Sequence, residues 1–316
     1  MSLMTRPPGP LNTRPMSMEA RRRKKFWNSL GIGLLFIAPW LIGFLTLTLY
    51  PFFSSLYYSF TSYNILSPAK WIGLENYQKL MGDTKFMASI GNTMYYTVIA
   101  VPLGVVLAVG LALLYNQKLP GNRLFRTLMY VPLIVPPVAT ALLWQWIFNP
   151  QVGLLNALLA KIGIVGPTWL GDPHWSKISL IIIAQWGVGG SVLLLLAALQ
   201  DVPRPLYEAA EIDGANLWHK FVHVTLPMIS PVVLFIAITG IINSFQVFTE
   251  AFIVSGGEGG PVNSTLFYSL YLFQQGFRYF HMGYASAMAW LLFLAVLTVT
   301  LIVFRTSARW VIYDRS

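Results

Sequence analysis

Long apolar runs, free of Asp, Glu, Lys and Arg, alternate along the chain with short polar segments. A helix needs about 20 mainly apolar residues to cross the hydrocarbon core of a bilayer. Runs of that length occupy residues 26–69, 86–117, 127–160, 178–200, 221–249 and 279–304. The pattern therefore predicts an all-α integral membrane protein. Its six transmembrane helices are expected near residues 30–52, 92–115, 126–148, 178–199, 229–250 and 284–304.

Composition supports a membrane protein. Of the 316 residues, 56% are hydrophobic and 10% are charged, with a mean hydropathy of +0.61. A soluble globular domain carries about 25% charged residues. The chain has no cysteine, which excludes disulfides, thiolate catalysis and cysteine-bound metals. His219 and His223 lie four residues apart, but no third ligand accompanies them, so no metal site is expected.

The basic residues are distributed unevenly, and their placement predicts an orientation. Seven of the 21 lie in the first 25 residues, directly before the first apolar run. If the N-terminus is cytoplasmic, 15 basic residues lie inside and six outside, which agrees with the positive-inside rule. We therefore expect both termini in the cytoplasm, and interpret the net charge of +10 as a topology signal instead of a nucleic-acid site.

These signals divide the chain. Residues 1–28 are expected to form a disordered basic cytoplasmic tail, and residues 29–304 a transmembrane domain. Residues 200–227 form a cytoplasmic loop within that domain, and residues 305–316 a cytoplasmic C-terminal tail.

The loop between the fourth and fifth expected spans differs from the rest of the chain. Residues 201–227 hold four of the 11 acidic residues. The pattern predicts a helix up to Ile212, a break at Gly214, a second helix from Ala215 to Val224, and an end at Pro227. Such an element suits docking of a soluble partner, although a solvated hairpin without a partner fits the spacing as well.

The same loop resembles the EAA motif of binding-protein-dependent ABC importer permeases. The motif requires Glu-Ala-Ala, three residues, Gly, nine residues, Ile, one residue and Leu-Pro. The matching residues are Glu208, Ala209, Ala210, Gly214, Val224, Leu226 and Pro227, with Val224 in place of Ile. Residues 71–77, 244–248, 259–261 and 282–289 are similar to the sugar-importer branch, of the maltose-transporter type. Relative to that branch, two extra residues lie near 256–260.

The resemblance implies a type I ABC importer permease bundle that works with other subunits. These would be a second permease, usually a different chain, a dimer of ATPase subunits and an external solute-binding protein. Membrane lipid surrounds such a bundle. The coupling contact with the ATPase would involve Glu208, Ala209, Ala210, Gly214, Leu226 and Pro227.

ATP chemistry is expected on the partner and not on this chain. No Gly-Lys dipeptide occurs, so the phosphate-binding loop G-x-x-x-x-G-K-[ST] is absent from the sequence. We therefore expect no enzymatic activity and no cofactor here, with ATP and Mg bound by the ATPase subunits.

Polar residues inside an expected span are candidates for the solute pathway, because they are costly in lipid. In the fifth span Asn243, Gln246 and Glu250 would share one face of a continuous helix. Amides beside aromatic rings suit a sugar or similar polar solute, although bonds between helices would also explain them. The pathway candidates are Asn243, Ser244, Phe245, Gln246 and Gln185. Glu250, Asn92 and Trp186 are weaker ones.

Two other classes of protein compete with this interpretation. An ion-gradient-driven secondary transporter would need no ATPase, and a membrane-embedded enzyme would need a catalytic constellation that the sequence lacks. The loop motif favours the importer, in a bacterial or archaeal plasma membrane.

Overall fold

The computed structural model describes residues 18–117 and 120–312, most of them helical. The chain divides into two compact units, Met1–Ser55 and Leu56–Ser316. Within the first unit α1 (Met18–Gly43) continues into the π-helical turn η1 (Phe44–Leu49) and the start of α2 (Tyr50–Ser59). This apolar run is long enough to cross a membrane over Lys25–Ser59.

The start of α1 corrects the expected tail. Residues 18–28 are helical, where a disordered segment was predicted as far as residue 28. Arg and Lys are strong helix formers, and no Gly or Pro separates the basic run from the apolar residues that start the span. Residues 1–17 lie outside the described residues.

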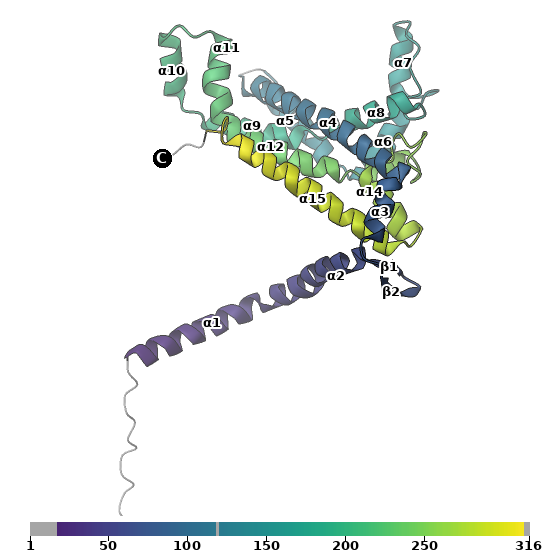
Figure 1. Cartoon of the computed structure of the whole chain (residues 1–316). Helices are drawn as coiled ribbons and strands as arrows, with labels where there is room; N and C mark the ends of the chain where they lie inside the picture. Colours follow the sequence, from purple (N-terminus) through teal and green to yellow (C-terminus); the bar gives the residue numbers. More distant parts are fainter. Residues whose placement is uncertain (1–17, 118–119, 313–316) are drawn as a thin grey trace, which may run out of the picture. The chain divides into compact units, whose positions relative to one another are not determined.

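The second unit contains a short hairpin and many helices (Figure 1). In chain order they are β1 (Thr61–Asn64), β2 (Ser67–Trp71), α3 (Glu75–Gly82), α4 (Thr84–Asn116), α5 (Asn122–Ile134), α6 (Pro137–Ile147), α7 (Leu154–Lys161), α8 (Pro173–Trp186), α9 (Gly189–Asp201), α10 (Arg204–Ile212), α11 (Leu217–Lys220), η2 (Phe221–Thr225), α12 (Leu226–Phe245), α13 (Thr249–Val254), α14 (Tyr268–Phe273), η3 (Gln274–Arg278) and α15 (Met282–Ser307). Figure 1 shows α10 and α11 at one end of the long helices α4, α12 and α15, with β1, β2 and α3 at the other.

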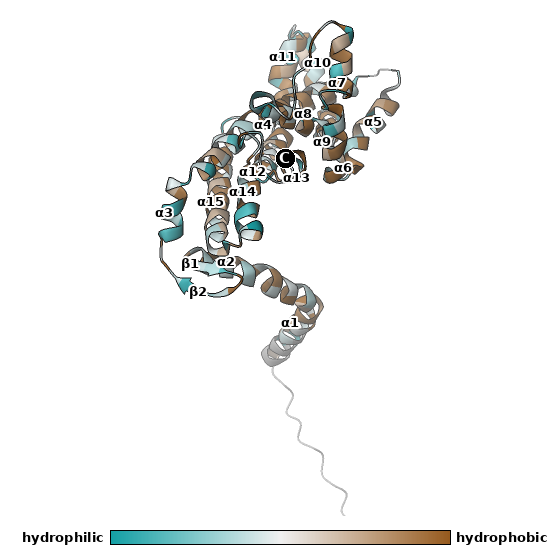
Figure 2. Ribbon diagram, turned by 90° about the vertical axis from the view of Figure 1, so that its right-hand side faces the viewer, coloured by the Kyte–Doolittle hydropathy of each residue, from teal (hydrophilic) through white to brown (hydrophobic). Residues whose placement is uncertain are grey.

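The β1–β2 hairpin is absent from the expected all-α fold. It pairs antiparallel, with Thr61 opposite Trp71 and Asn64 opposite Ser67. It lies at the end of an apolar run, where composition alone did not separate it from the first span. In Figure 2 the hairpin and α3 are mostly hydrophilic, whereas α6 and α9 are mostly hydrophobic.

Two of the expected spans are bent pairs of helices. The helices α5 and α6 meet at 105°, and α8 and α9 at 46°, so the described residues hold four spanning helices, or six if each pair is one span. Pro136 and Pro137 explain the sharper bend. Proline disfavours the α conformation in the residue before it, and Val135 is extended. The expected single helix over 126–148 is therefore broken.

The fifth span also differs from its prediction at both ends. Pro227 does not end the loop helix, because α11, η2 and α12 are continuous. In the π turn the Leu226 N–H donates to the carbonyl of Phe221, five residues back. At the other end α12 stops at Phe245 instead of continuing to residue 250.

The core of this unit has two large clusters. One gathers around Ala108, Leu195 and Ile229, where α4, α9 and α12 pack together. The other surrounds Leu180 and Phe267, closer to the end that carries the β1–β2 hairpin. Small residues such as Ala108 let helices approach closely in a membrane, where packing must replace the hydrophobic effect.

Candidate functional site

A cavity of about 620 Å³ opens between the helices of the second unit. Its volume lies in the range of small-molecule sites. The walls come from α4, the start of α6, the α8–α9 bend, α12, the irregular residues 246–248 and α13. Backbone that leaves the helical state inside a membrane is tolerated where it lines such a cavity.

The cavity brings together four of the five pathway candidates. Its walls include Gln185, Asn243, Ser244 and Gln246. Phe245 points elsewhere. It is 6% exposed and lines a separate apolar pocket beside Leu291.

The prediction that Asn243 and Gln246 share one helical face is wrong, although both amides line the same cavity. α12 ends before Gln246, whose N–H donates to the Asn243 carbonyl at 3.1 Å. Among the described residues, neither amide side chain has a hydrogen-bond partner, and both are exposed to the cavity. They are therefore free to bind a solute or a partner chain.

Gln185 and Asn92 behave differently from these two amides. The Gln185 amide donates to the carbonyls of Ala100 and Ile181, at 3.3 and 3.2 Å, and so ties α8 to α4. Asn92 lies away from the cavity and donates to the carbonyls of Asn263 and Leu266. Asn92, a weak pathway candidate by its sequence position, therefore anchors the segment between α13 and α14.

The cavity is also lined by Tyr96, which was not among the pathway candidates, and by Glu250, which was one of the weaker candidates. Tyr96 lies on α4, far in sequence from the fifth span. A signal existed for it, because Asn92, Thr93, Tyr96 and Thr97 recur at helical spacing in an apolar run and are all buried. Polar residues repeated at that spacing mark a face turned away from lipid.

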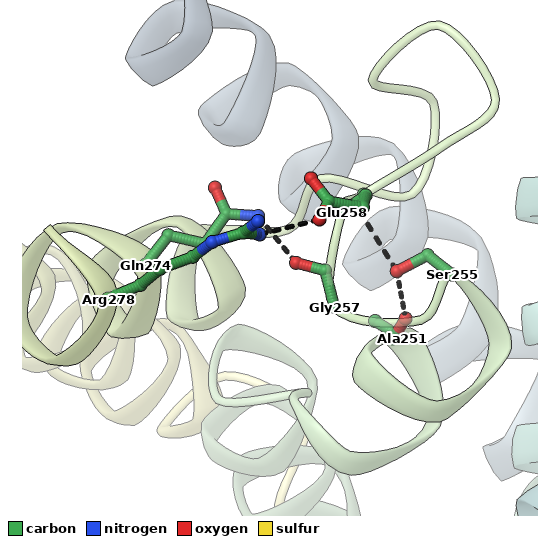
Figure 3. A network of polar contacts seen from close by, with 7 residues as sticks. Ala251, Ser255, Gly257, Glu258, Gln274 and Arg278 are labelled. Atoms are coloured by element: carbon green, nitrogen blue, oxygen red, sulfur yellow. Dashed lines mark hydrogen bonds and ion pairs between the residues drawn. The ribbon is translucent and has the colours of Figure 1, made fainter.

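The segment after α13 is held by a network of polar contacts (Figure 3). The Gln274 amide donates to the Gly257 carbonyl at 2.7 Å, and Arg278 pairs with Glu258 at 2.7 Å. The hydrogen bond to Glu258, together with its charge, raises the pKa of the Arg278 guanidinium. These two contacts join η3 to the loop that follows α13.

Asp83 joins three elements beside the hairpin. Its carboxylate caps α4 by accepting from the N–H groups of Lys85 and Phe86. It also accepts from the hydroxyls of Tyr271, at 2.5 Å, and Tyr284, at 2.7 Å. Burial alone would raise the pKa of Asp83, but these hydrogen bonds outweigh it and hold the pKa below its ordinary value.

The α10–α11 hairpin has the helix–Gly–helix form that the sequence predicts. Gly214 has a φ of +78°. The Ala215 N–H donates to the Ala210 carbonyl and the Gly214 N–H to the Glu211 carbonyl, as in a Schellman motif. No atom lies within 4 Å of a Cβ built on Gly214, so its conformation and not its space requires glycine.

The hairpin presents an apolar surface that nothing in the described chain covers. Ile212 is 87% exposed, Leu217 85% and Trp218 68%. The motif residues Glu208 and Ala209 are exposed on α10, and Ala210 is half-buried. Leu226 and Pro227 lie instead at the start of α12, so the motif spans two elements.

Similarity to known proteins agrees with this geometry. The family model described as "Binding-protein-dependent transport system inner membrane component" matches residues 100–313. The chain belongs to this family. It is 43% identical to "Probable ABC transporter permease protein YesP" of Bacillus subtilis (strain 168), over 89% of this chain and 92% of YesP. It is 37% identical to "Lactose transport system permease protein LacF" of Rhizobium radiobacter, over 86% and 92% of the two chains.

A solved structure shares the fold. It is described as "Crystal structure of bacterial alginate ABC transporter in complex with alginate pentasaccharide-bound periplasmic protein". The TM-score is 0.78 at 23% identity, and the match covers 92% of this chain and 96% of that one. The protein is thus a permease subunit of an ABC importer, a multi-pass protein of the inner membrane. The secondary-transporter alternative is set aside.

In this permease two of the four stretches similar to sugar importers hold together the end that carries the β1–β2 hairpin. Asn76, within residues 71–77, donates at 2.9 Å to the carbonyls of Ser59 and Thr61. Gly283, within residues 282–289, packs so closely that a Cβ would overlap the Thr61 carbonyl oxygen. Both residues are explained by packing, without contact to a solute.

Proposed function

We propose that this permease forms part of a pathway that imports a sugar or similar small polar solute. The observation that carries the proposal is the cavity of about 620 Å³, into which the unpartnered amides of Asn243 and Gln246 project. Amides supply both donors and acceptors for hydroxyl groups, and Phe248 adds a ring to the same wall. The name of LacF, a lactose transport permease, supports a sugar as cargo.

The proposed topology has six spans with both termini in the cytoplasm. It counts each bent pair, α5–α6 and α8–α9, as one crossing. The distribution of basic residues along the sequence supports this orientation. The α10–α11 hairpin would then lie in the cytoplasm, and the β1–β2 hairpin outside.

The proposed driving step is ATP hydrolysis, with Mg, on separate ATPase subunits. The exposed apolar side chains of Ile212, Leu217 and Trp218 support docking of the α10–α11 hairpin on such a subunit, because large exposed apolar groups mark interaction sites. Glu208 and Ala209 would lie at the edge of that contact. Leu226 and Pro227 would instead transmit movement to α12.

The proposed assembly also includes a second permease, a different chain, and an external solute-binding protein. The alginate transporter, whose description includes a periplasmic protein, supports the last partner. The cavity is open in the isolated chain, which supports a pathway shared with a second permease.

The docking proposal is tested by affinity purification of tagged chain from detergent-solubilised native membranes, comparing wild type with Gly214→Asp. We expect wild type to bring down an ATPase subunit and a second permease, and the variant to lose the ATPase. Gly163→Asp is a matched control, because Gly163 also has a positive φ of +77° and no atom within 4 Å of a Cβ. ATPase retained by Gly214→Asp, or lost equally by Gly163→Asp, contradicts docking at the hairpin.

The pathway proposal is tested by uptake into proteoliposomes that hold the whole complex, with ATP on the ATPase side. Radiolabelled lactose and maltose serve as probes, with leucine as a non-sugar comparison. We expect Asn243→Ala combined with Gln246→Ala to lower sugar uptake about tenfold or more, because two hydrogen bonds are lost. Gln151→Ala, an exposed amide outside the cavity, should leave uptake unchanged.

A further inference from the structure

The side chain of Tyr96 lines the cavity. The residue is 7% exposed, and its ring packs edge-to-face on Phe267 with centroids 5.3 Å apart. Among the described residues no group forms a hydrogen bond with the Tyr96 hydroxyl, although the residue lines the cavity. Buried tyrosine hydroxyls usually find a partner, so an unpartnered one at a cavity wall is available to a bound solute.

Glu250 lines the same cavity, from α13. Among the described residues no Lys, Arg or His lines the cavity, and none forms an ion pair with Glu250. A carboxylate inside a spanning run is costly unless it serves the solute pathway or pairs with a partner.

A second tyrosine shows what a purely structural hydroxyl looks like here. Tyr268 is as buried as Tyr96, at 5% exposure, and packs edge-to-face on Phe86. Its hydroxyl donates to the Met288 carbonyl at 2.7 Å and so joins α14 to α15. Tyr96 and Tyr268 are therefore equally buried and similarly packed, but only the Tyr268 hydroxyl forms a hydrogen bond within the described residues.

We infer that Tyr96 and Glu250 recognise hydroxyl groups on the cargo. The Tyr96 O–H donates to one cargo oxygen, and the Glu250 carboxylate accepts from the cargo O–H groups. A neutral saccharide or polyol supplies such hydroxyl groups. A cargo carboxylate or phosphate at this position would meet an unpaired negative charge. The inference rests on the proposed function, because it assumes that cargo passes through this cavity.

The test uses the complete complex, with its solute-binding protein, in proteoliposomes. Radiolabelled lactose and maltose are the probes, and wild type is compared with Tyr96→Phe, Glu250→Gln and Tyr268→Phe. We expect Tyr96→Phe and Glu250→Gln each to lower the import rate at saturating binding protein about five- to tenfold. The melting temperature of Tyr96→Phe should stay at the wild-type value. Tyr268→Phe should lower the melting temperature and leave import per folded complex unchanged.

A series of monodeoxy analogues of whichever disaccharide is imported separates recognition from indirect effects. For the analogue that lacks the hydroxyl bound by Tyr96, wild type and Tyr96→Phe should import at the same rate. If every analogue keeps the full difference, or if Tyr96→Phe imports lactose and maltose at the wild-type rate, the inference is wrong while the proposed function stands. If wild type imports neither sugar while hydrolysing ATP, the proposed function fails, and the inference fails with it.

Discussion

The α10–α11 hairpin and the opposite end of the same unit, where α3, α14 and the start of α15 meet, are held by different kinds of bond. In the hairpin the contacts are local, such as the Lys220–Glu211 ion pair, nine residues apart. At the opposite end they join distant segments. Asp83 and Tyr284 are 201 residues apart, and Asn92 and Leu266 are 174 apart.

The two ends therefore differ in how strongly they are tied to the rest of the unit. The hairpin has few bonds to the rest of the chain and exposes apolar side chains, which suits an element that a partner grips and displaces. The opposite end is crosslinked through buried amides and a carboxylate, which fix the positions of α3, α4, α14 and α15 relative to one another. Substitutions at the two ends should therefore change different measurements.

The largest loss of stability is expected from Gly283→Ala. The added methyl group would overlap the Thr61 carbonyl oxygen, and this backbone atom cannot turn aside. We expect the free energy of unfolding to fall by about 3 kcal/mol or more, measured as thermal unfolding in detergent. Gly91→Ala is the control, because no atom lies within 4 Å of its Cβ, and it should leave the melting temperature unchanged or raise it.

A smaller loss is expected from Asp83→Asn, at about 2 kcal/mol. The carboxylate holds two tyrosine hydroxyls and an α-helix N-terminus, and hydrogen bonds to a charged group are stronger than neutral ones. Asp172→Asn is the comparison, since Asp172 caps α8 through the His174 N–H without tyrosine partners. Equal losses in the two variants would show that the tyrosine bonds add nothing.

Acidification should remove part of the stabilisation that the Asp83 carboxylate provides. Because folding lowers the pKa of Asp83 below its ordinary value of 3.8, its stabilisation is present above that pH and is lost as the pH falls through the lowered pKa. The difference in melting temperature between wild type and Asp83→Asn should be constant from neutral pH to about pH 4 and shrink below it. A difference that grows on acidification would contradict this sign.

The smallest effect on stability is expected from Gly214→Ala, although its effect on transport should be large. A left-handed conformation costs a non-glycine residue about 1 kcal/mol, and the strain stays within a hairpin that has few bonds to the rest. We expect a near-normal melting temperature with a reduced ratio of solute imported to ATP hydrolysed. A normal ratio would show that the turn at Gly214 does not couple the subunits.

Local sequence rules determined several features correctly. Charge-free runs located the apolar segments, and the spacing around Gly214 predicted the α10–α11 hairpin, because a Schellman turn depends on neighbours only. The same rules failed at the α5–α6 bend and at the end of α12. Both breaks lie inside charge-free apolar runs, and the count of charge-free residues does not register the bend after Val135 or the end of α12 at Phe245.

The sequence by itself determined that this chain enters a membrane, that a helix–Gly–helix hairpin precedes the fifth span, and that polar residues interrupt that span. Only the tertiary structure decided that Tyr96 and Glu250 line one cavity with Asn243 and Gln246, and that Phe245 points away from it. The physical reason is the distance along the chain over which each interaction acts. Caps, turns and apolar length act between neighbours, whereas a cavity wall depends on which faces distant helices turn towards each other, and packing of the whole unit sets those faces.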